Sequence, residues 1–451
     1  MVTAKEATKS QLCSPTRASI LTGQTPLRTG ITAPTAHLGQ VKLKPSLEKN
    51  PNPANKAVIL ESVTRLDNGL PTLAKQFKKA GYATAHFGKW HLGAAPYSPL
   101  QHGFDIDIPH FAGPGPAGSF VAPWKYQNFN EKYAEEHIED RMADEAITWL
   151  RSLDMSKPFF MNYWQFSVHA PFDAKESLKK YYRTKVDLTD PQHSSTYAAM
   201  VHSLDQAVGR LLDEIDRLGI AENTIIVFTS DNGGNMYNGI ADILPCGKKY
   251  ITPPTSNRPL RGGKATMFEG GIRVPTIISY PSMTIPGTTS DQIIQSTDFY
   301  PTLLNLARLP MPKNHVIDGL DITATLKGEA IERDGIITYF PHQPRVPDWL
   351  PPAISIHAGN WKLIRLFHQG ENLNHDYLLY NLEWDIGQHN NLAEMYPEKI
   401  TELDKLIEDK IKVSNSILLI PNPKFDQTKY ARERIGIQQG GYKGVNKIEI
   451  N

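Results

Sequence analysis

Cysteine is nearly absent from this chain, which has Cys13 and Cys246 as the two cysteines in 451 residues. Two cysteines form at most one disulfide, and a zinc site built from cysteines needs more of them. This scarcity excludes a disulfide-stapled scaffold and a cysteine-based zinc module. We expect Cys246 to be an ordinary thiol, so the position of Cys13 near the start of the chain is what needs an explanation.

The chain also lacks long hydrophobic runs and an excess of charge of either sign. No stretch of eighteen or more apolar residues occurs, which argues against a membrane span. Lysine plus arginine total 48 against 47 aspartate plus glutamate, so the net charge of +1 gives no general attraction for nucleic acid. Any anion-binding site is therefore local. The first residues, MVTAKEATKS, lack the apolar core of a secretory signal, so no export is predicted for the chain as written.

Helical patterns followed by apolar strand patterns recur along the first half of the chain. They occupy residues 71–88, 140–166 and 201–230. In each of them, apolar residues at helical spacing precede a short, mostly apolar run. Alternating helices and strands predict an α/β fold with a mostly parallel sheet covered by helices on both faces.

The pattern changes after a proline-rich stretch, HQPRVPDWLPP. Residues 354–367 and 376–386 read as antiparallel strands, and a helix is predicted at about residues 397–412. We therefore predict two domains: a catalytic domain over residues 1–342 and a smaller α+β domain with an antiparallel sheet over residues 343–451.

Polar motifs follow each of the three predicted strands of the first domain. GKWHLG comes after the first strand, VHAP after the second and DNGG after the third. Ligands of open α/β sheets bind beyond the carboxyl ends of the strands. The three motifs are therefore expected to lie at one edge of the sheet.

The CSPTR stretch that contains Cys13 has the features of a helix start. Ser14 is a candidate N-cap, Pro15 suits the first turn, and Gly23 is a candidate stop. Free amides at a helix N-terminus favour an anion, so Cys13 is expected to face a sulfate- or phosphate-like group. Taken alone, the residue is equally explained as a small buried hydrophobe.

The longer stretch CSPTRASILTG, from Cys13 to Gly23, is similar to the signature of the type I sulfatases of the alkaline phosphatase superfamily. The resemblance covers nearly the whole chain, because further motifs of that family follow in the same order. They are GKWHLG (88–93), VHAPF (168–172), TSDNGG (229–234), RGGKATMFEGGIRVP (261–275), STDFYPTLLNLA (296–307) and GNWKLIR.

The resemblance implies catalytic roles for several residues. Cys13 would be converted to formylglycine by a formylglycine-generating or sulfatase-maturing enzyme, and the hydrated aldehyde would be the nucleophile. Arg17 would steady its hydroxyls. His169 would protonate the leaving alkoxide, and His91 would remove a proton from the second hydroxyl.

Lys89 and Lys264 complete the catalytic set that the resemblance implies. Together with His169 they would bind the sulfate group, because fixed cations offset the negative charge of its oxygens in the transition state. Taken one at a time, such residues are more often solvated lysines or structural histidines. Their occurrence together, in the order of the family, favours the catalytic interpretation.

The resemblance also implies a calcium site at Asp231 and Asn232, with the modified Cys13 as a further ligand. Carboxylate and amide oxygens suit Ca²⁺, or less well Mg²⁺, rather than zinc. Asp-Asn-Gly-Gly is equally a turn sequence. The family supplies further calcium ligands from an Asp-Asp pair on its first strand, and the chain has no Asp-Asp dipeptide. We therefore interpret the sequence as an N-terminally truncated sulfatase that lacks this strand.

The sequence thus predicts a sulfuric ester hydrolase acting on an aryl sulfate or a sulfated glycan, similar to bacterial N-acetylgalactosamine-6-sulfatases and arylsulfatases. One alternative is an inactive remnant that binds sulfated glycans. Another is a phosphatase or phosphodiesterase of the same superfamily, although these use serine or threonine as the nucleophile. No nucleic acid partner is expected. Localisation is left open, because the full-length relatives are mostly periplasmic or secreted, whereas the chain as written shows no secretory signal.

Overall fold

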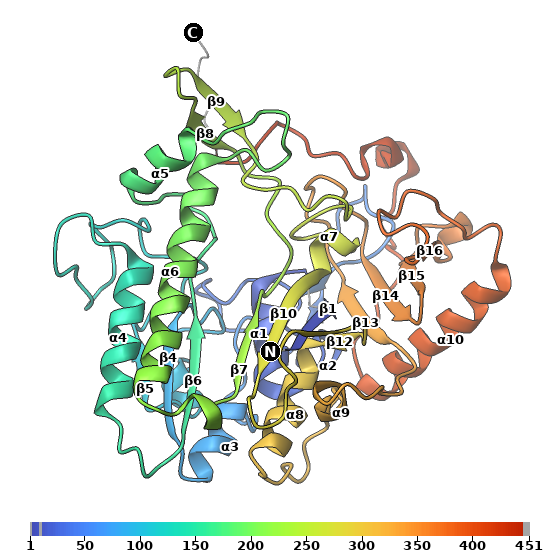
Figure 1. Ribbon diagram of the computed structural model, residues 1–451. Coiled ribbons are helices and arrows are strands. Elements are labelled where there is room, and N and C mark those ends of the chain that lie inside the picture. The colour runs from blue at the N-terminus through green and yellow to red at the C-terminus, as the bar shows by residue number, and fades with distance from the viewer. Residues whose placement is uncertain (1, 9–10, 445–451) are drawn as a thin grey trace. The chain divides into compact units, whose positions relative to one another are not determined.

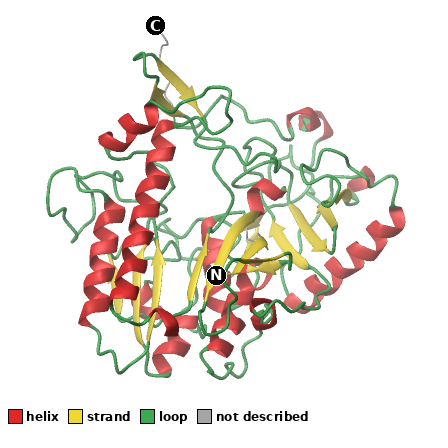
Figure 2. Ribbon diagram, viewed as in Figure 1, coloured by secondary structure: helices red, strands yellow, loops and turns green. Residues whose placement is uncertain are grey.

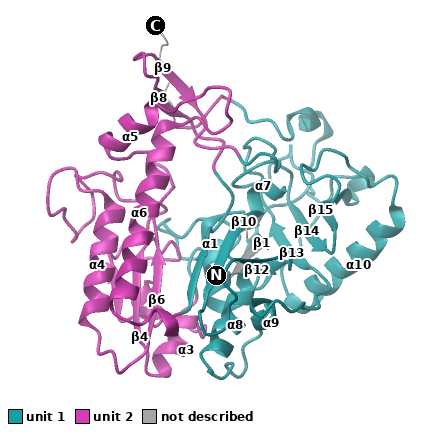
Figure 3. Cartoon of the chain, in the orientation of Figure 1, with its two compact units in different colours: residues 1–66, 225–234, 257–439 teal, residues 67–224, 235–256, 440–451 magenta. Residues whose placement is uncertain are grey.

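The structure is a computed structural model that describes residues 2–8 and 11–444. By their contacts, the residues divide into two compact units (Figure 3). Unit 1 comprises residues 1–66, 225–234 and 257–439, and unit 2 comprises residues 67–224, 235–256 and 440–451. Each unit therefore combines distant parts of the sequence. The division into domains at residue 342 stays a prediction.

Unit 2 contains a three-stranded parallel sheet in the order β5, β4, β6. The central strand β4 (Ala83–Gly88) pairs with β5 (Ile106–Ile108) on one side and with β6 (Phe159–Trp164) on the other. The helix α3 (Leu73–Lys79) leads into β4, as the pattern predicts. Because β4 and β6 are parallel, the segments that follow them begin at the same edge of the sheet.

Two long helices of unit 2, α4 (Ile138–Ser152) and α6 (Ser195–Arg217), pack against each other (Figure 1). Both were predicted from their periodicity. The apolar pattern predicted from residue 201 onward holds at Leu211 and Ile215, which are buried, but Val201 is 43% exposed. The buried stripe of α6 also runs through Ala199 and Ala207. Small residues form much of this stripe, which brings the helix close to its neighbours.

The larger sheet of unit 1 is mixed. Its strands follow the order β11, β1, β10, β7, and β12 also pairs with β1. These strands are β1 (Val2–Thr8), β7 (Ile226–Thr229), β10 (Arg273–Ser279), β11 (Thr288–Ser290) and β12 (Ile294–Gln295). β1 is antiparallel to β10 and parallel to β11 and β12, and β7 is antiparallel to β10. β1 precedes Cys13, where no strand was predicted because the chain has no Asp-Asp dipeptide and was interpreted as lacking the family's first strand.

A four-stranded antiparallel sheet forms the second sheet of unit 1, in the order β13, β14, β15, β16. The strands are β13 (Ile336–Phe340), β14 (Ala353–Ala358), β15 (Trp361–Leu366) and β16 (Asp376–Asn381). The helix α10 (Pro397–Ser414) packs on it through Leu403, Ile407 and Ile411. The predicted antiparallel strands and the predicted helix are confirmed.

A short hairpin lies within residues 240–252 of unit 2, a segment for which the sequence patterns predicted no strand. Its strands are β8 (Ile240–Ile243) and β9 (Lys249–Thr252), joined by a turn with Gly247 at φ 88°. The strand pattern is hidden in the sequence because the inward position that follows Ile240 on the same face is the charged Asp242. This carboxylate is buried and accepts hydrogen bonds from the hydroxyls of Ser194 and Thr196, at the start of α6.

The remaining helices and strands are short, and Figure 2 shows how loops connect all of them. They are α2 (Pro26–Thr29), β2 (Ser46–Leu47), β3 (Leu60–Glu61), α5 (Glu176–Arg183), α7 (Glu269–Ile272), α8 (Phe299–Leu306) and α9 (Thr323–Leu326). Among the helices of the described residues, none has both the length and the apolar character that a bilayer crossing requires.

Candidate active site

The first helix of unit 1, α1 (Cys13–Thr22), begins at Cys13, so the thiol lies at a helix N-terminus as predicted. The N-cap is Leu12, with an extended backbone, rather than the predicted Ser14. Ser14 is already helical and fully buried, so the helix starts before it. The helix ends at Gly23 as predicted, where the φ of 69° is a left-handed conformation that glycine adopts without strain.

The side chains of Asn232 and Lys264, both in unit 1, meet at the Cys13 thiol. The Sγ atom donates to Asn232 Oδ1 at 3.5 Å, and Lys264 Nζ donates to Sγ at 3.5 Å. Cys13 is 2% exposed and Lys264 is 6% exposed. A lysine ammonium this deeply buried is uncommon unless it has an anionic or polar partner. The arrangement therefore holds a fixed cation beside the sulfur.

Arg17, one turn along α1, binds the carboxylate of Asp231. Its Nη2 and Nε atoms donate to Asp231 Oδ2 at 2.8 and 3.0 Å. The hydroxyl of Thr16 donates to the Asp231 backbone carbonyl at 2.7 Å. Thr16 occupies a variable position of the cysteine motif, so the motif does not single it out. These contacts hold α1 on the segment that follows β7.

The two glycine-rich motifs of unit 1 approach each other closely. The Gly233 amide donates to the Gly271 carbonyl at 2.9 Å, and the Lys264 amide donates to the Gly234 carbonyl at 2.9 Å. A Cβ atom on Gly233 would lie 1.8 Å from the carbonyl oxygen of Gly270. Glycine is therefore required at Gly233 for close packing, and the contact places Lys264 beside Asn232.

A buried ion pair supports the far end of the Lys264 loop. Lys362 Nζ donates to Glu269 Oε1 at 2.7 Å, and the two side chains are 0% and 3% exposed. Burial raises the pKa of Glu269, but Lys362 together with His357 and Arg273 outweighs this effect, and the pKa lies below its ordinary value. The Glu269 amide donates to Gln388 Oε1 at 2.7 Å. The GNWKLIR motif therefore contributes a structural lysine.

Asp231 and Asn232 offer hard oxygen ligands of the kind that calcium takes. However, Asp231 Oδ2 already accepts both hydrogen bonds from Arg17. Within residues 2–8 and 11–444, no group of three or more histidine, cysteine, aspartate or glutamate side chains is arranged to hold a metal ion. Calcium takes about six to eight ligands. The described residues therefore fit only part of a calcium shell, and the calcium site stays a prediction.

Unit 2 contains the remaining predicted residues, and two of them follow β4. The Lys89 amide donates to the Trp164 carbonyl at 2.7 Å, which extends the pairing of β4 with β6. A Cβ atom on Gly88 would lie 2.1 Å from the same carbonyl oxygen, so glycine is required there. Lys89 and His91 are 2% and 0% exposed. His91 has a φ of 56°, which non-glycine residues seldom adopt.

His169 lies in the loop that follows β6. Its amide donates to the Phe166 carbonyl at 3.2 Å, and its ring Nδ1 lies 2.7 Å from the Ala170 carbonyl oxygen. A carbonyl oxygen only accepts, so Nδ1 carries the proton and Nε2 is the nitrogen available for proton exchange. A Cβ atom on Gly115 would lie 3.1 Å from Nδ1, so the 111–120 loop packs closely here.

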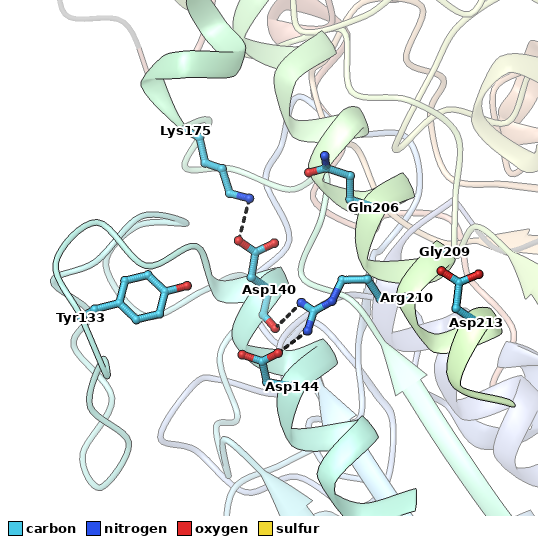
Figure 4. Close-up of a pocket in the computed structure, with 8 residues that line it drawn as sticks. All are labelled: Tyr133, Asp140, Asp144, Lys175, Gln206, Gly209, Arg210 and Asp213. Atoms are coloured by element: carbon cyan, nitrogen blue, oxygen red, sulfur yellow. Dashed lines mark hydrogen bonds and ion pairs between the residues drawn. The ribbon is translucent and has the colours of Figure 1, made fainter. Parts of the chain in front are cut away.

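A surface pocket of about 540 Å³ on unit 2 is separate from these residues (Figure 4). It lies between α4 and α6, and the residues lining it are Tyr133, Asp140, Asp144, Lys175, Gln206, Gly209, Arg210 and Asp213. Lys175 pairs with Asp140 at 2.6 Å, and Arg210 pairs with Asp144. Because both cations of the pocket are paired with carboxylates, it offers no arrangement suited to a sulfate group.

Comparison with known protein families decides the classification. The model of the sulfatase family matches residues 2–309. The chain belongs to the sulfatase family. A second model, the C-terminal region of N-sulphoglucosamine sulphohydrolase, matches residues 263–415. The family predicted from the cysteine motif is therefore confirmed.

Individual relatives agree with this classification. N-acetylgalactosamine-6-sulfatase of Rattus norvegicus is 34% identical over 346 residues, which cover 71% of this chain. The match spans 58% of the rat protein's length. A sulfatase of Formosa agariphila is 31% identical over 459 residues, with 87% of this chain and 76% of that protein covered.

Solved structures share the fold of this sulfatase-family chain. The crystal structure of Ps i-CgsB in complex with k-i-k-neocarrahexaose has a TM-score of 0.71 at 22% identity and covers 91% of this chain and 84% of that one. The structure of BT4656 in complex with its substrate D-glucosamine-2-N,6-O-disulfate has a TM-score of 0.63 at 19% identity and covers 92% and 91%. The predicted α/β fold with a C-terminal antiparallel sheet is confirmed.

Proposed function

We propose that this chain hydrolyses sulfate esters of carbohydrates. The observation that carries the proposal is the buried Cys13 thiol, in a sulfatase signature, with the Lys264 ammonium and the Asn232 amide oxygen each 3.5 Å away. A thiol with no reaction to perform does not need a buried cation beside it. A reacting group that meets a sulfate does need one, because the sulfate brings negative charge.

Formylglycine at position 13, the modification implied by the family signature, would supply a hydrated aldehyde as the nucleophile. Arg17 is bound to Asp231 and lies one helical turn from that position, so its guanidinium is fixed on the same face of the cluster. Lys264 would bind the non-bridging oxygens of the sulfate. Fixed cations of this kind stabilise charge that grows in the transition state without having to reorganise.

The reaction needs one proton donor and one proton acceptor. In the overall hydrolysis, the bond between sulfur and the alcohol oxygen breaks, a water oxygen ends on the released sulfate, and the alkoxide leaves as an alcohol. We assign the proton of the alcohol to the imidazolium form of His169, which donates it from Nε2 because Nδ1–H is held by the Ala170 carbonyl. We assign proton removal on the nucleophile side to His91, and sulfate binding to Lys89.

A sulfated sugar is the substrate class that we favour over an aryl sulfate. The rat relative is named for a 6-sulfated N-acetylgalactosamine, and the two solved structures described above contain saccharide ligands. A sugar alcohol is a poor leaving group. Its departure depends strongly on protonation, which suits a site with a histidine whose imidazolium form carries a proton on Nε2.

The proposal is tested by producing the chain with and without a formylglycine-generating enzyme. Mass spectrometry of the residue 13 peptide reads the modification, and ion chromatography reads sulfate released from sulfated hexosamines. We expect release from the modified protein. Cys13→Ala should reduce it by at least about 10³-fold, as for loss of a nucleophile. Sulfated oligosaccharide that binds without turnover would favour the inactive binder, and release from phosphate esters alone would favour a phosphatase.

A further inference from the structure

Glu139, in the first turn of α4 of unit 2, is a buried carboxylate with no assigned task. The side chain is 0% exposed. Burial raises its pKa to about 7, and hydrogen bonds from the Phe166–Ser167 segment oppose this effect. The negative charge of Asp140 raises the pKa of Glu139 further. A glutamate is seldom completely buried, because removing its charge from water is costly. The contacts of Glu139 therefore indicate its role.

The carboxylate of Glu139 binds the backbone of the His169 loop. Its Oε1 atom accepts a hydrogen bond from the Ser167 amide at 2.7 Å. Its Oε2 atom has no hydrogen-bond partner among the described residues. An amide that donates to a carboxylate forms a short bond, stronger than one to a neutral acceptor. The main contact of this buried group is thus to a loop amide two residues before His169.

The same loop sets the direction of the His169 ring. The His169 amide closes a turn onto the Phe166 carbonyl at 3.2 Å, and Nδ1 donates to the Ala170 carbonyl at 2.7 Å. The ring is therefore aimed by the backbone of residues 166–170. Within that backbone, the Ser167 amide is held by its hydrogen bond to the buried Glu139 side chain of α4. A shift at Ser167 would move the plane in which Nε2 lies.

We propose that Glu139 is a positioning residue for His169, which it serves by holding the Ser167 amide so that the imidazole Nε2 keeps its direction. This inference rests on the proposed function, in which His169 protonates the leaving alcohol. The competing explanation is that Glu139 only stabilises α4, since an acidic residue in the first turn interacts favourably with the helix dipole. The two explanations differ in which reaction step and which segment a substitution affects.

Three variants separate these explanations. Glu139→Leu removes the acceptor, whereas Glu139→Gln keeps a side-chain oxygen that can accept from the Ser167 amide. Asp144→Asn is the matched control, because Asp144 lies on the same helix but binds Arg210 rather than the loop (Figure 4). Glu139→Leu and Glu139→Gln remove the same carboxyl group from the first turn of α4, so a difference between them reports the loss of the acceptor, and Asp144→Asn reports the loss of a charge further along the helix.

The first measurement is hydrogen exchange of peptides covering residues 165–171, which does not depend on turnover. We expect Glu139→Leu to speed exchange of the Ser167 amide by at least about tenfold, because a lost hydrogen bond exposes it to opening. Glu139→Gln and Asp144→Asn should leave it near the wild-type rate. Unchanged exchange in Glu139→Leu, or equally fast exchange in Asp144→Asn, would overturn the proposal.

The second measurement compares a sugar sulfate with 4-nitrophenyl sulfate. Nitrophenolate leaves without protonation, so it does not need His169, whereas a sugar alkoxide does. Glu139→Leu should lower kcat for the sugar sulfate on the order of 10²-fold, the cost of misplacing a catalytic group by about 1 Å. For the nitrophenyl ester, kcat should fall several-fold less, and Glu139→Gln should recover most of the loss.

Equal losses of kcat on both esters would show a structural role for Glu139 and would overturn the proposal. Failure of the proposed function gives a different result. In that case the wild-type protein, with residue 13 modified, releases sulfate from neither ester, and the exchange measurement alone decides whether Glu139 holds the loop. His169→Ala provides the reference, since it should show the same preference for the nitrophenyl ester.

Discussion

The two units hold their predicted site residues through different kinds of contact. In unit 1, charged side chains hold one another, as Arg17 holds Asp231. In unit 2, backbone groups do most of this work: the Lys89 amide extends a strand pairing, and the His169 ring donates to the Ala170 carbonyl. Substitutions that remove a charge should therefore disturb unit 1 most, and substitutions that displace the main chain should disturb unit 2 most.

The largest effect is expected for Glu269→Gln in unit 1. It leaves the Lys362 ammonium, which is 0% exposed, without its carboxylate partner. Removal of one member of a buried pair costs about 3–5 kcal/mol of unfolding free energy. Urea denaturation followed by tryptophan fluorescence measures it. Replacement of both residues, by Glu269→Leu with Lys362→Met, should return stability to within about 1 kcal/mol of wild type; a double variant as unstable as the single one would contradict this account.

Asp231→Asn should destabilise the chain by about 3 kcal/mol, because Arg17 is 7% exposed and loses the carboxylate that it binds. The same denaturation experiment measures the change. Glu176→Gln is the control, since Glu176 pairs with Arg183 at the surface. Exposed pairs contribute about 0–1 kcal/mol. If the two variants lost equal stability, the contrast between buried and exposed pairs would not hold.

In unit 2, the stability of Glu139→Gln should depend on pH differently from that of wild type. The pKa of Glu139 is raised from 4.5 to about 7 on folding, so the folded state binds the extra proton. The stability that this bound proton contributes is fully present below about pH 4.5 and is lost as pH rises through 7. Relative to wild type, the variant should gain on the order of 2–3 kcal/mol between pH 4.5 and 8.

Unfolding free energies from urea titrations at pH 5 and pH 8 test this expectation for Glu139. Asp144→Asn, on the same helix, provides the reference slope. A difference between Glu139→Gln and wild type that stays constant with pH would show that the carboxyl pKa is not raised by folding.

The smallest effect is expected for Gly115→Ala, which perturbs the His169 loop through its backbone. The added Cβ would lie 2.5 Å from the Ala170 carbonyl oxygen and 3.1 Å from His169 Nδ1. Displacement of the ring should lower kcat for a sugar sulfate about tenfold. Gly209→Ala on α6 is the control, because a Cβ there meets nothing within 4 Å. Similar kcat values for the two variants would contradict tight packing of Gly115.

Sequence patterns predicted the elements that bury a regular apolar face. The helix α4 carries that signal. The motifs that follow the predicted strands gave the site residues through family resemblance. The patterns failed where a buried position is polar. The hairpin β8–β9 was missed because Asp242 faces inward, and Glu139 was missed because its partner Ser167 is 28 residues away and is bound through a backbone amide. Neither position has a periodicity that reveals it.

The assembly of unit 1 from three separate segments fixes an order of events during synthesis. Residues 67–224 of unit 2 leave the ribosome as one continuous stretch, whereas residues 1–66 have to wait for residues 257–439. At typical translation rates that delay is on the order of tens of seconds. Cys13, which is 2% exposed once folded, is open to another protein during this interval. An enzyme that modifies the Cys13 sulfur would therefore have to act before residues 257–439 are synthesised and folded.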